Sequence, residues 1–297
     1  MPNKFNVIRV PDDAGEATEV MGSKPKFWYY GVTLGRCLYK QSRPGTGEDW
    51  AEKVAAELAE LLSLPHATVE LATWRDTRGT VSPSFVPRDD ALIHGNEILL
   101  AVVPGYPGSR PGSRNFYRVR EHTLEVVLSV LATGLVLPPR GWTLPNGVTN
   151  AVDVFVGYLL LDAWIGNTDR HHENWAFIGH LVELTPTETY ESYLAPTYDH
   201  ASSLGRNEPD ARRRQRLTTK DAAFSVKAYV EKATSAFYTK AGDERPLTTL
   251  DAFAEAARRA SGAARAWLAR LADLEAEAIQ SIFDHLPDDR ISEAGVA

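Results

Sequence analysis

The sequence predicts an α+β fold with two lobes, a small lobe rich in β-strands and a larger lobe that is mainly helical. Short stretches rich in aromatic and β-branched residues fill most of the first hundred positions. Longer stretches with apolar residues at helical spacing fill the second half of the chain. Between them, "PGYPGSRPGSR" holds three Gly and three Pro in eleven residues, as linkers do. We therefore divide the chain into a first lobe at 1–104, a linker at 105–114 and a second lobe at 115–297.

The first lobe begins with three stretches that favour strands. "KFNVIRV", "KPKFWYYGV" and "GRCLYKQ", within residues 4–40, predict an antiparallel meander. The next stretch, residues 48–64, places Trp50, Val54 and Leu58 on one stripe, which predicts an amphipathic helix that ends near Pro65. "ATVELATW", "TVSPSFV" and "EILLAVV" predict three further strands. The first lobe is thus expected to be a sheet with one helix.

The second lobe has wider apolar faces. Residues 119–135 and 150–164 predict buried helices, and residues 175–199 predict short strands around a polar loop. Two more helical regions, at 222–238 and 248–283, are predicted to close the chain.

Composition and charge exclude several classes of protein. A net charge of −7 lacks the basic excess of a nucleic-acid-binding protein, so we expect no direct nucleic-acid binding. One basic run, Arg212, Arg213, Arg214 and Arg216, is typical of a solvated face. The longest apolar stretch, "VFVGYLLL", is eight residues, far below the roughly 20 that span a bilayer. A single cysteine, Cys37, and an N-terminus without an apolar signal segment predict a cytoplasmic protein.

The polar loop "WIGNTDRHHENWAFIG" carries the strongest indication of function. Its Asp, His and Glu are metal-ligand types, but adjacent residues point in different directions, which disfavours a zinc or iron site. Asp169 and Asn174 stand at the D-x-x-x-x-N interval of a phosphoryl-transfer loop, after a predicted helix and before a predicted strand. In that chemistry the Asp handles the proton of the attacking hydroxyl and the Asn holds Mg²⁺. Asp199, 25 residues after Asn174, suits the second metal carboxylate.

The first lobe contains matching partners in the required order. Lys40, at the end of a predicted strand, could hold the phosphates of ATP, and the following helix offers Glu52, Glu57 or Glu60 to hold that lysine. Gly22 could form a turn over the phosphates. Each of these residues is usually a surface residue, and only the ordered set indicates a kinase.

The motifs "MGSKPKF", "LYK", "IGNTDRHHENWAF" and "APTYDHASSLG" together resemble the HipA-like serine/threonine kinase family, in order from about Val20 to Gly205. The resemblance implies a protein-kinase-like two-lobed fold that uses ATP and Mg²⁺. It implies that Asp169 is catalytic, that Asn174 and Asp199 bind Mg²⁺, and that Lys40 binds ATP with support from Glu52.

The family pattern also implies minor roles. Gly22, Ser23 and Lys24 would form the phosphate loop, and His171 would brace the catalytic loop. His172 and Glu173 match no family position, so we expect them at the surface. With the loop glycine already at 22, we expect the compact form of the family, without an additional N-terminal subdomain.

Three functions remain open. The first is a protein serine/threonine kinase, with a growth-regulating toxin as one version of it. Such an enzyme would act on a protein substrate and could have an antitoxin or regulatory partner. The second is a small-molecule phosphotransferase of the aminoglycoside-kinase type, whose loop usually has His just before the Asp, whereas here Thr168 precedes Asp169. The third is a non-catalytic nucleotide-binding or partner-binding module, which the intact polar set of the loop disfavours.

Overall fold

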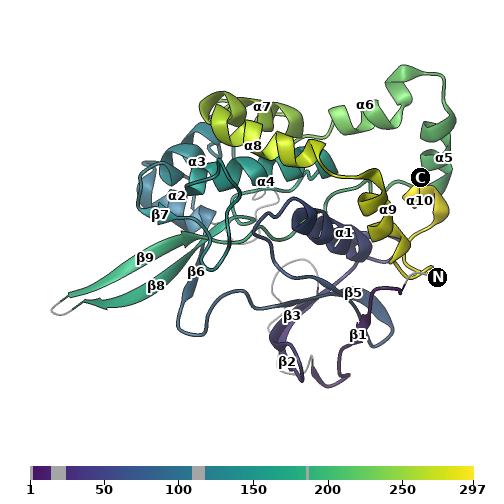
Figure 1. Ribbon diagram of the computed structural model, residues 1–297, viewed down its shortest axis with the longest axis horizontal. Coiled ribbons are helices and arrows are strands. Elements are labelled where there is room, and N and C mark those ends of the chain that lie inside the picture. Colours follow the sequence, from purple (N-terminus) through teal and green to yellow (C-terminus); the bar gives the residue numbers. More distant parts are fainter. Residues whose placement is uncertain (1–2, 15–24, 109–117, 185–186) are drawn as a thin grey trace.

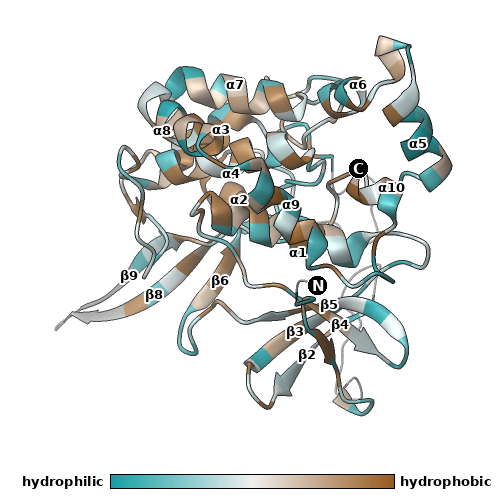
Figure 2. Cartoon of the chain, turned by 45° about the vertical axis from the view of Figure 1, so that its right-hand side comes forward, coloured by the Kyte–Doolittle hydropathy of each residue, from teal (hydrophilic) through white to brown (hydrophobic). Residues whose placement is uncertain are grey.

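The protein combines two β-sheets with helices that pack mainly against one another. The computed structural model describes residues 3–14, 25–108, 118–184 and 187–297. One sheet lies below helix α1 (Glu48–Leu61) in Figure 1, and the long hairpin of the second sheet points away from the body. Hydrophobic residues gather where the helices meet, and helix α5 (Asp210–Thr218) is mostly hydrophilic (Figure 2). The α+β class predicted from the sequence is therefore confirmed.

The first sheet has five strands in the order β1-β4-β5-β3-β2. Its strands are β1 (Val7–Arg9), β2 (Lys26–Gly31), β3 (Gly35–Gln41), β4 (Glu70–Trp74) and β5 (Thr77–Pro83). The predicted meander is correct for β2 and β3, which pair antiparallel, but wrong for β1, which pairs in parallel with β4. A short turn favours antiparallel pairing of consecutive strands, but sixteen residues, 10–25, separate β1 from β2, and the two strands lie at opposite edges of the sheet.

Helix α1 (Glu48–Leu61) packs against β4 and β5 of this sheet. The predicted stripe of Trp50, Val54 and Leu58 is buried, as expected for an amphipathic helix on a sheet. The helix ends three residues before the predicted end, because Ser63 has a left-handed φ of 56° that cannot continue it. Arg290, near the C-terminus, forms a buried ion pair of 2.7 Å with Asp49, so the end of the chain is attached to the first turn of α1.

The second sheet has four strands in the order β6-β8-β9-β7. Its strands are β6 (Ala91–His94), β7 (Val136–Leu137), β8 (Ala176–Leu184) and β9 (Thr187–Leu194). "EILLAVV" was predicted as a strand, but it lies in helix α2 (Gly95–Val102). The Glu97 carboxylate accepts from the His94 backbone N–H at 2.9 Å in a capping box, which starts a helix at this point.

The division at residue 104 stays a prediction. Strand β6, although it precedes the Gly/Pro segment, pairs with β8 of the second sheet. Residues 109–114 of the predicted linker lie outside the described ranges.

Helix α4 (Ala151–Ile165) is buried on almost every side and packs against α7 and α8. Asn150 caps its start and Gly166, with φ 63°, ends it in the left-handed conformation that glycine adopts easily. The other helices are α3 (Leu124–Leu131), α5 (Asp210–Thr218), α6 (Val226–Glu231), α7 (Thr249–Arg259), α8 (Ser261–Ala272), α9 (Ala276–Asp284), α10 (Glu293–Val296) and the 3-10 turn η2 (Ala222–Phe224).

One helical prediction and the prediction of a solvated basic run need correction. The region 222–238 forms only η2 and α6, because the chain after them pairs with its later part, as Ser235 N–H donates to Leu247 C=O at 2.8 Å. The basic run lies on α5 and is only partly solvated, since Arg213 and Arg216 form ion pairs with Asp210 and Glu208. Within the described ranges no helix has the length and apolar character that crossing a membrane requires.

Candidate active site

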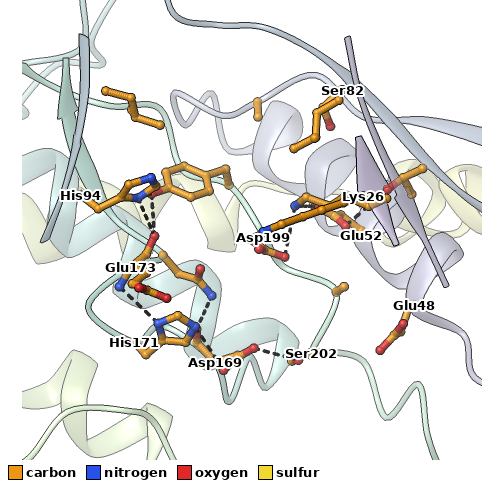
Figure 3. Close-up of a pocket in the computed structure, with 18 of the residues that line it drawn as sticks. Lys26, Glu48, Glu52, Ser82, His94, Asp169, His171, Glu173, Asp199 and Ser202 are labelled. Carbon is orange, nitrogen blue, oxygen red and sulfur yellow. Dashed lines mark hydrogen bonds and ion pairs between the residues drawn. The ribbon is translucent and has the colours of Figure 1, made fainter. Parts of the chain in front are cut away.

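A cleft of about 1540 Å³ lies between the first sheet with α1 on one side and the polar loop after α4 on the other. Strands β2, β3 and β5 and helix α1 supply one wall, and residues 168–174 and 198–206 supply much of the other. Figure 3 shows Lys26, Glu52 and Asp199 close together, with Asp169, His171 and Ser202 on the opposite side. Segments far apart in the sequence therefore contribute charged groups to one space.

Lys40 joins the two walls of the cleft. Its ammonium lies 3.2 Å from Glu52 Oε1 of α1 and 3.2 Å from Asp199 Oδ1 of the opposite wall. Glu52 is the helix acid that reaches the lysine. Lys53, the next residue of α1, turns away and contacts Glu57 and Glu70.

Charge stabilises this arrangement in its ionised form. Burial lowers the pKa of Lys40, but the charges of Asp199 and Glu52 raise it by more, so the pKa lies above its ordinary value. Burial raises the pKa of Asp199, but the Lys40 ammonium reverses this and holds that pKa at about 2. Lysine and aspartate therefore both stay charged throughout the neutral pH range.

The backbone at Asp199 is unusual. Its φ is 61°, in the left-handed region that a non-glycine residue seldom adopts. Its neighbours are anchored, because Tyr198 Oη donates to Glu173 C=O at 2.8 Å and His200 Nε2 lies 2.8 Å from Thr197 Oγ1. Strained residues held by their surroundings concentrate at functional sites, and here the strain directs a carboxylate toward Lys40.

The polar loop closes on itself below the cleft. Asn174 Nδ2 donates to Asp169 C=O at 2.7 Å, and Asp169 N–H donates to Asn167 Oδ1 at 3.2 Å. The Asp169 side chain is 45% exposed and lines the cleft, whereas Asn174 is buried. The sequence spacing thus places both side chains at one face of the cleft.

Arg170 is a buried residue of this loop that sequence reasoning missed. Its guanidinium donates to both carboxylate oxygens of Asp162, at 2.8 and 2.7 Å, and to Asn174 C=O at 2.9 Å. A bidentate pair of this kind is strong and directional. The available indication in the sequence was Asp162, an acid near the end of a mostly apolar helix. The Arg170–Asp162 pair attaches the loop to the end of α4.

His171 is buried beside the cleft. Its Nδ1 accepts from the Glu173 N–H at 3.1 Å, which leaves Nε2 as the protonated nitrogen, 3.8 Å from Asp169 Oδ1. Burial lowers the pKa of His171 to about 4, so the ring is neutral at pH 7. Its predicted bracing role stays a prediction that this geometry suits.

The prediction that His172 is a surface residue is wrong. His172 is buried, and its Nδ1 lies 2.8 Å from Tyr106 Oη. It packs below the loop near His122, with ring centres 6.0 Å apart. Glu173 lines the cleft and is half-buried. Local sequence gave no sign of this, because the loop is polar on both of its faces.

The donor groups suit a hard cation. Asp199 offers a carboxylate, and Asn174 offers an amide oxygen, since its amide nitrogen is already engaged with Asp169 C=O. One or two such oxygens, together with phosphate oxygens and water, make a usual Mg²⁺ environment. These two residues therefore fit the ion that the sequence motifs imply.

The predicted phosphate loop, Gly22, Ser23 and Lys24, lies outside the described residues. Lys26, just after it, pairs with Lys40 across the β2–β3 ladder and lines the cleft. A second lysine therefore lines the cleft beside Lys40, and Figure 3 shows it near Asp199 and Glu52.

The chain is similar in structure to a solved kinase. The crystal structure of a Helicobacter pylori proinflammatory kinase, CtkA, matches with a TM-score of 0.63 and 17% identity, over 98% of this chain and 90% of that chain. The HipA–HipB toxin–antitoxin complex with operator DNA from Shewanella oneidensis MR-1 matches with a TM-score of 0.43 and 17% identity, over 90% of this chain and 62% of that chain. No protein-family model and no curated protein matches the sequence. The first match shows that the fold is kinase-like.

Proposed function

We propose that this chain is an ATP- and Mg²⁺-dependent serine/threonine protein kinase of HipA-like type, which transfers the γ-phosphate of ATP to a protein hydroxyl. One observation carries the proposal. Lys40 is held between Glu52 and Asp199 in the same cleft that Asp169 and Asn174 line from the opposite side. A kinase needs these groups together, and they come from four separate segments of the chain.

In this proposal Lys40 binds the phosphates of ATP. An ammonium has three donors, and Glu52 and Asp199 use two of them, which leaves one for a phosphate oxygen. Glu52 fixes the direction of the ammonium, because its own side chain is only 5% exposed and has little freedom. The lysine thus acts as a point charge on the α/β-phosphates.

Asp199 and Asn174 would hold Mg²⁺, whose contribution when bound is to neutralise charge on the β- and γ-phosphates. Asp199 is suited to this because its pKa of about 2 keeps the carboxylate ionised. Asn174 is suited because its buried amide is fixed by the Asp169 carbonyl.

Asp169 would orient the acceptor hydroxyl and take its proton. Its carboxylate is 45% exposed on the cleft and so can reach a substrate, while its backbone is held by Asn167 and Asn174. A fixed backbone with an accessible carboxylate is the arrangement that a general base needs.

The assignment of a protein acceptor, and of a growth-regulating toxin with an antitoxin or regulatory partner, rests on the sequence motifs. The "NTDRHHEN" loop has its histidines after Asp169, and His171 is buried beside that residue. Loops of the small-molecule phosphotransferases usually place His before the Asp, so this order favours the protein kinase over that alternative.

The test is phosphoryl transfer from γ-labelled ATP with Mg²⁺, with the protein alone and with a cell lysate, followed by mass spectrometry. The proposal expects label on serine or threonine of proteins. Label that appears only on small molecules would support the alternative phosphotransferase, and absence of any transfer would contradict kinase activity.

A further inference from the structure

Helix α1 carries two acids, one turn apart, that contact different parts of the cleft. Glu52 holds Lys40, and Glu48 binds Arg206 on the opposite wall. Residues four apart lie on the same helix face, so one movement of α1 would shift both contacts. Glu48 is 3% exposed, and its Oε1 also accepts from Arg43 Nη1 at 2.9 Å. Its carboxylate is therefore paired and fixed.

Arg206 extends this contact to Asp169. While Nη1 donates to Glu48, Nη2 donates to Ser202 Oγ at 3.0 Å, and Ser202 Oγ in turn donates to Asp169 Oδ2 at 3.3 Å. The planar guanidinium holds its two donors in a fixed relation, which a lysine ammonium could not reproduce. A continuous chain of hydrogen bonds thus runs from α1 to the proposed base.

The backbone fixes both ends of this chain. Gly47 N–H donates to Arg206 C=O at 3.0 Å, at the start of α1. Thr168 N–H donates to Ser202 C=O at 3.1 Å, directly beside Asp169. Arg206 is attached to α1 through its side chain and its backbone, and Ser202 is attached to the loop in the same way. Figure 3 shows the Ser202 side chain next to Asp169, with Glu48 further along the cleft.

We propose that Arg206 is a positioning residue: held by Glu48, it directs the Ser202 hydroxyl onto the Asp169 carboxylate and so fixes the orientation of the base. The inference rests on the proposed function. It makes α1 the element that sets the phosphate-binding lysine through Glu52 and the base through Glu48. The position of the phosphate-binding lysine and the orientation of the base then both depend on the position of α1.

A serine held by a catalytic aspartate could instead be the group that is phosphorylated. Arg206 argues against this, because its N–H donation to the Ser202 oxygen lowers the nucleophilicity of that oxygen, and the hydroxyl is held between Arg206 and Asp169. Ser202 is accordingly assigned as a donor to Asp169 and not as an acceptor of phosphate.

The test compares Ser202→Ala, Ser202→Thr, Arg206→Lys and the Ser202→Ala/Arg206→Lys double variant, with Arg212→Ala of the exposed surface of α5 as the control. The assay is transfer from γ-labelled ATP to the protein itself and to lysate proteins. We expect Ser202→Ala and Arg206→Lys each to lower kcat by about 10-fold with the KM for ATP changed less than about twofold. Ser202→Thr keeps the hydroxyl and should stay close to the wild-type kcat.

Because Arg206 acts through Ser202, the double variant should be no slower than Ser202→Ala alone. Three results would overturn the positioning role while leaving the kinase proposal in place. They are a kcat of the double variant reduced by the product of the two single reductions, a wild-type kcat in Ser202→Ala, and phosphate on Ser202 in the wild-type protein. Ser202→Ala leaves the Glu48–Arg206 ion pair intact, so its kcat tests the positioning role even if the Arg206→Lys protein unfolds. A wild-type protein that transfers no phosphate to either acceptor would overturn the proposed function and the positioning role together.

Discussion

Replacing Lys40 by Met would remove the ammonium between Glu52 and Asp199 and keep most of the aliphatic stem. A hydrogen bond to a charged group is worth about 1.5–3 kcal/mol. Since about 1.4 kcal/mol corresponds to tenfold, loss of one such contact to a phosphate should lower kcat/KM for ATP by about 10- to 150-fold.

The substitution should also destabilise the fold. The Glu52 carboxylate is 5% exposed and would lose a cation at 3.2 Å, which we expect to cost about 1–3 kcal/mol. A fall in activity alone would therefore not distinguish catalysis from stability. The comparison needs another ion-paired lysine of low exposure that does not contribute to the cleft.

Lys53→Met is that control. Lys53 lies on α1 beside Glu52, its side chain is 5% exposed against 21% for Lys40, and its ammonium contacts Glu57 at 2.8 Å and Glu70 at 3.1 Å. Lys53 is not among the residues that line the cleft. Both variants should lower the unfolding temperature to a similar degree, and only Lys40→Met should reduce transfer.

The assay is steady-state transfer from γ-labelled ATP, with thermal unfolding recorded on the same samples. A folded Lys40→Met protein with kcat/KM within about threefold of wild type would refute the reasoning and make Lys26 the next candidate. Equal losses of activity in Lys40→Met and Lys53→Met would show that the effect acts through stability.

Three further predictions follow from the same geometry. Asp199→Asn should abolish the Mg²⁺-dependent part of ATP binding, because the metal loses its charged ligand, and calorimetry with and without Mg²⁺ would show an unchanged difference if the assignment is wrong. Burial lowers the pKa of His66 and of His171 from 6.5 to about 4. Between pH 6.5 and 4 the unfolded chain therefore binds more protons than the folded protein, and the free energy of unfolding should fall as the pH drops through this range. Urea unfolding at pH 7, 6 and 5 would measure this free energy. A free energy that does not change with pH would contradict the prediction, and His66→Gln should show a smaller change with pH than the wild type. Ser82 and Ser84, which line the cleft, are candidates for autophosphorylation. Peptide mass spectrometry after incubation with ATP tests this, and the prediction is wrong if both serines are unmodified while other proteins are labelled.

The parts of the site that local sequence determines were predictable. Asp169 and Asn174 lie in one short loop, whose geometry follows from the end of α4 at Gly166 and the start of β8. Asp199 follows β9, which pairs with β8, so the order of elements already brings it near that loop. The sequence therefore placed these side chains without any knowledge of distant contacts.

Other features depend on contacts between distant segments. The choice of Glu52 over Glu57 rests on which turn of α1 reaches Lys40, and the sequence indicated it only through a family resemblance. Arg206 contacts Glu48, 158 positions earlier in the chain, only because the fold brings α1 beside it. Likewise, Arg170 is buried only because Asp162 of α4 faces it. Such pairs leave no periodic pattern in the sequence.

The most direct test of the central claim is the Asp169→Asn protein. This change keeps the shape and hydrogen-bonding capacity of the side chain and removes its charge and basicity. Metal and phosphate contacts are assigned to other residues, Asn174, Asp199 and Lys40. The unfolding temperature and the Mg²⁺-dependent ATP affinity should therefore stay close to wild type.

The decisive measurement is single-turnover phosphoryl transfer by this variant beside its ATP affinity. We predict a rate lower by about 10²- to 10⁴-fold, the usual contribution of a general base, with ATP affinity within about twofold of wild type. Transfer at a rate near wild type, in a folded protein that binds ATP normally, would contradict the assignment of Asp169 and with it the proposed mechanism.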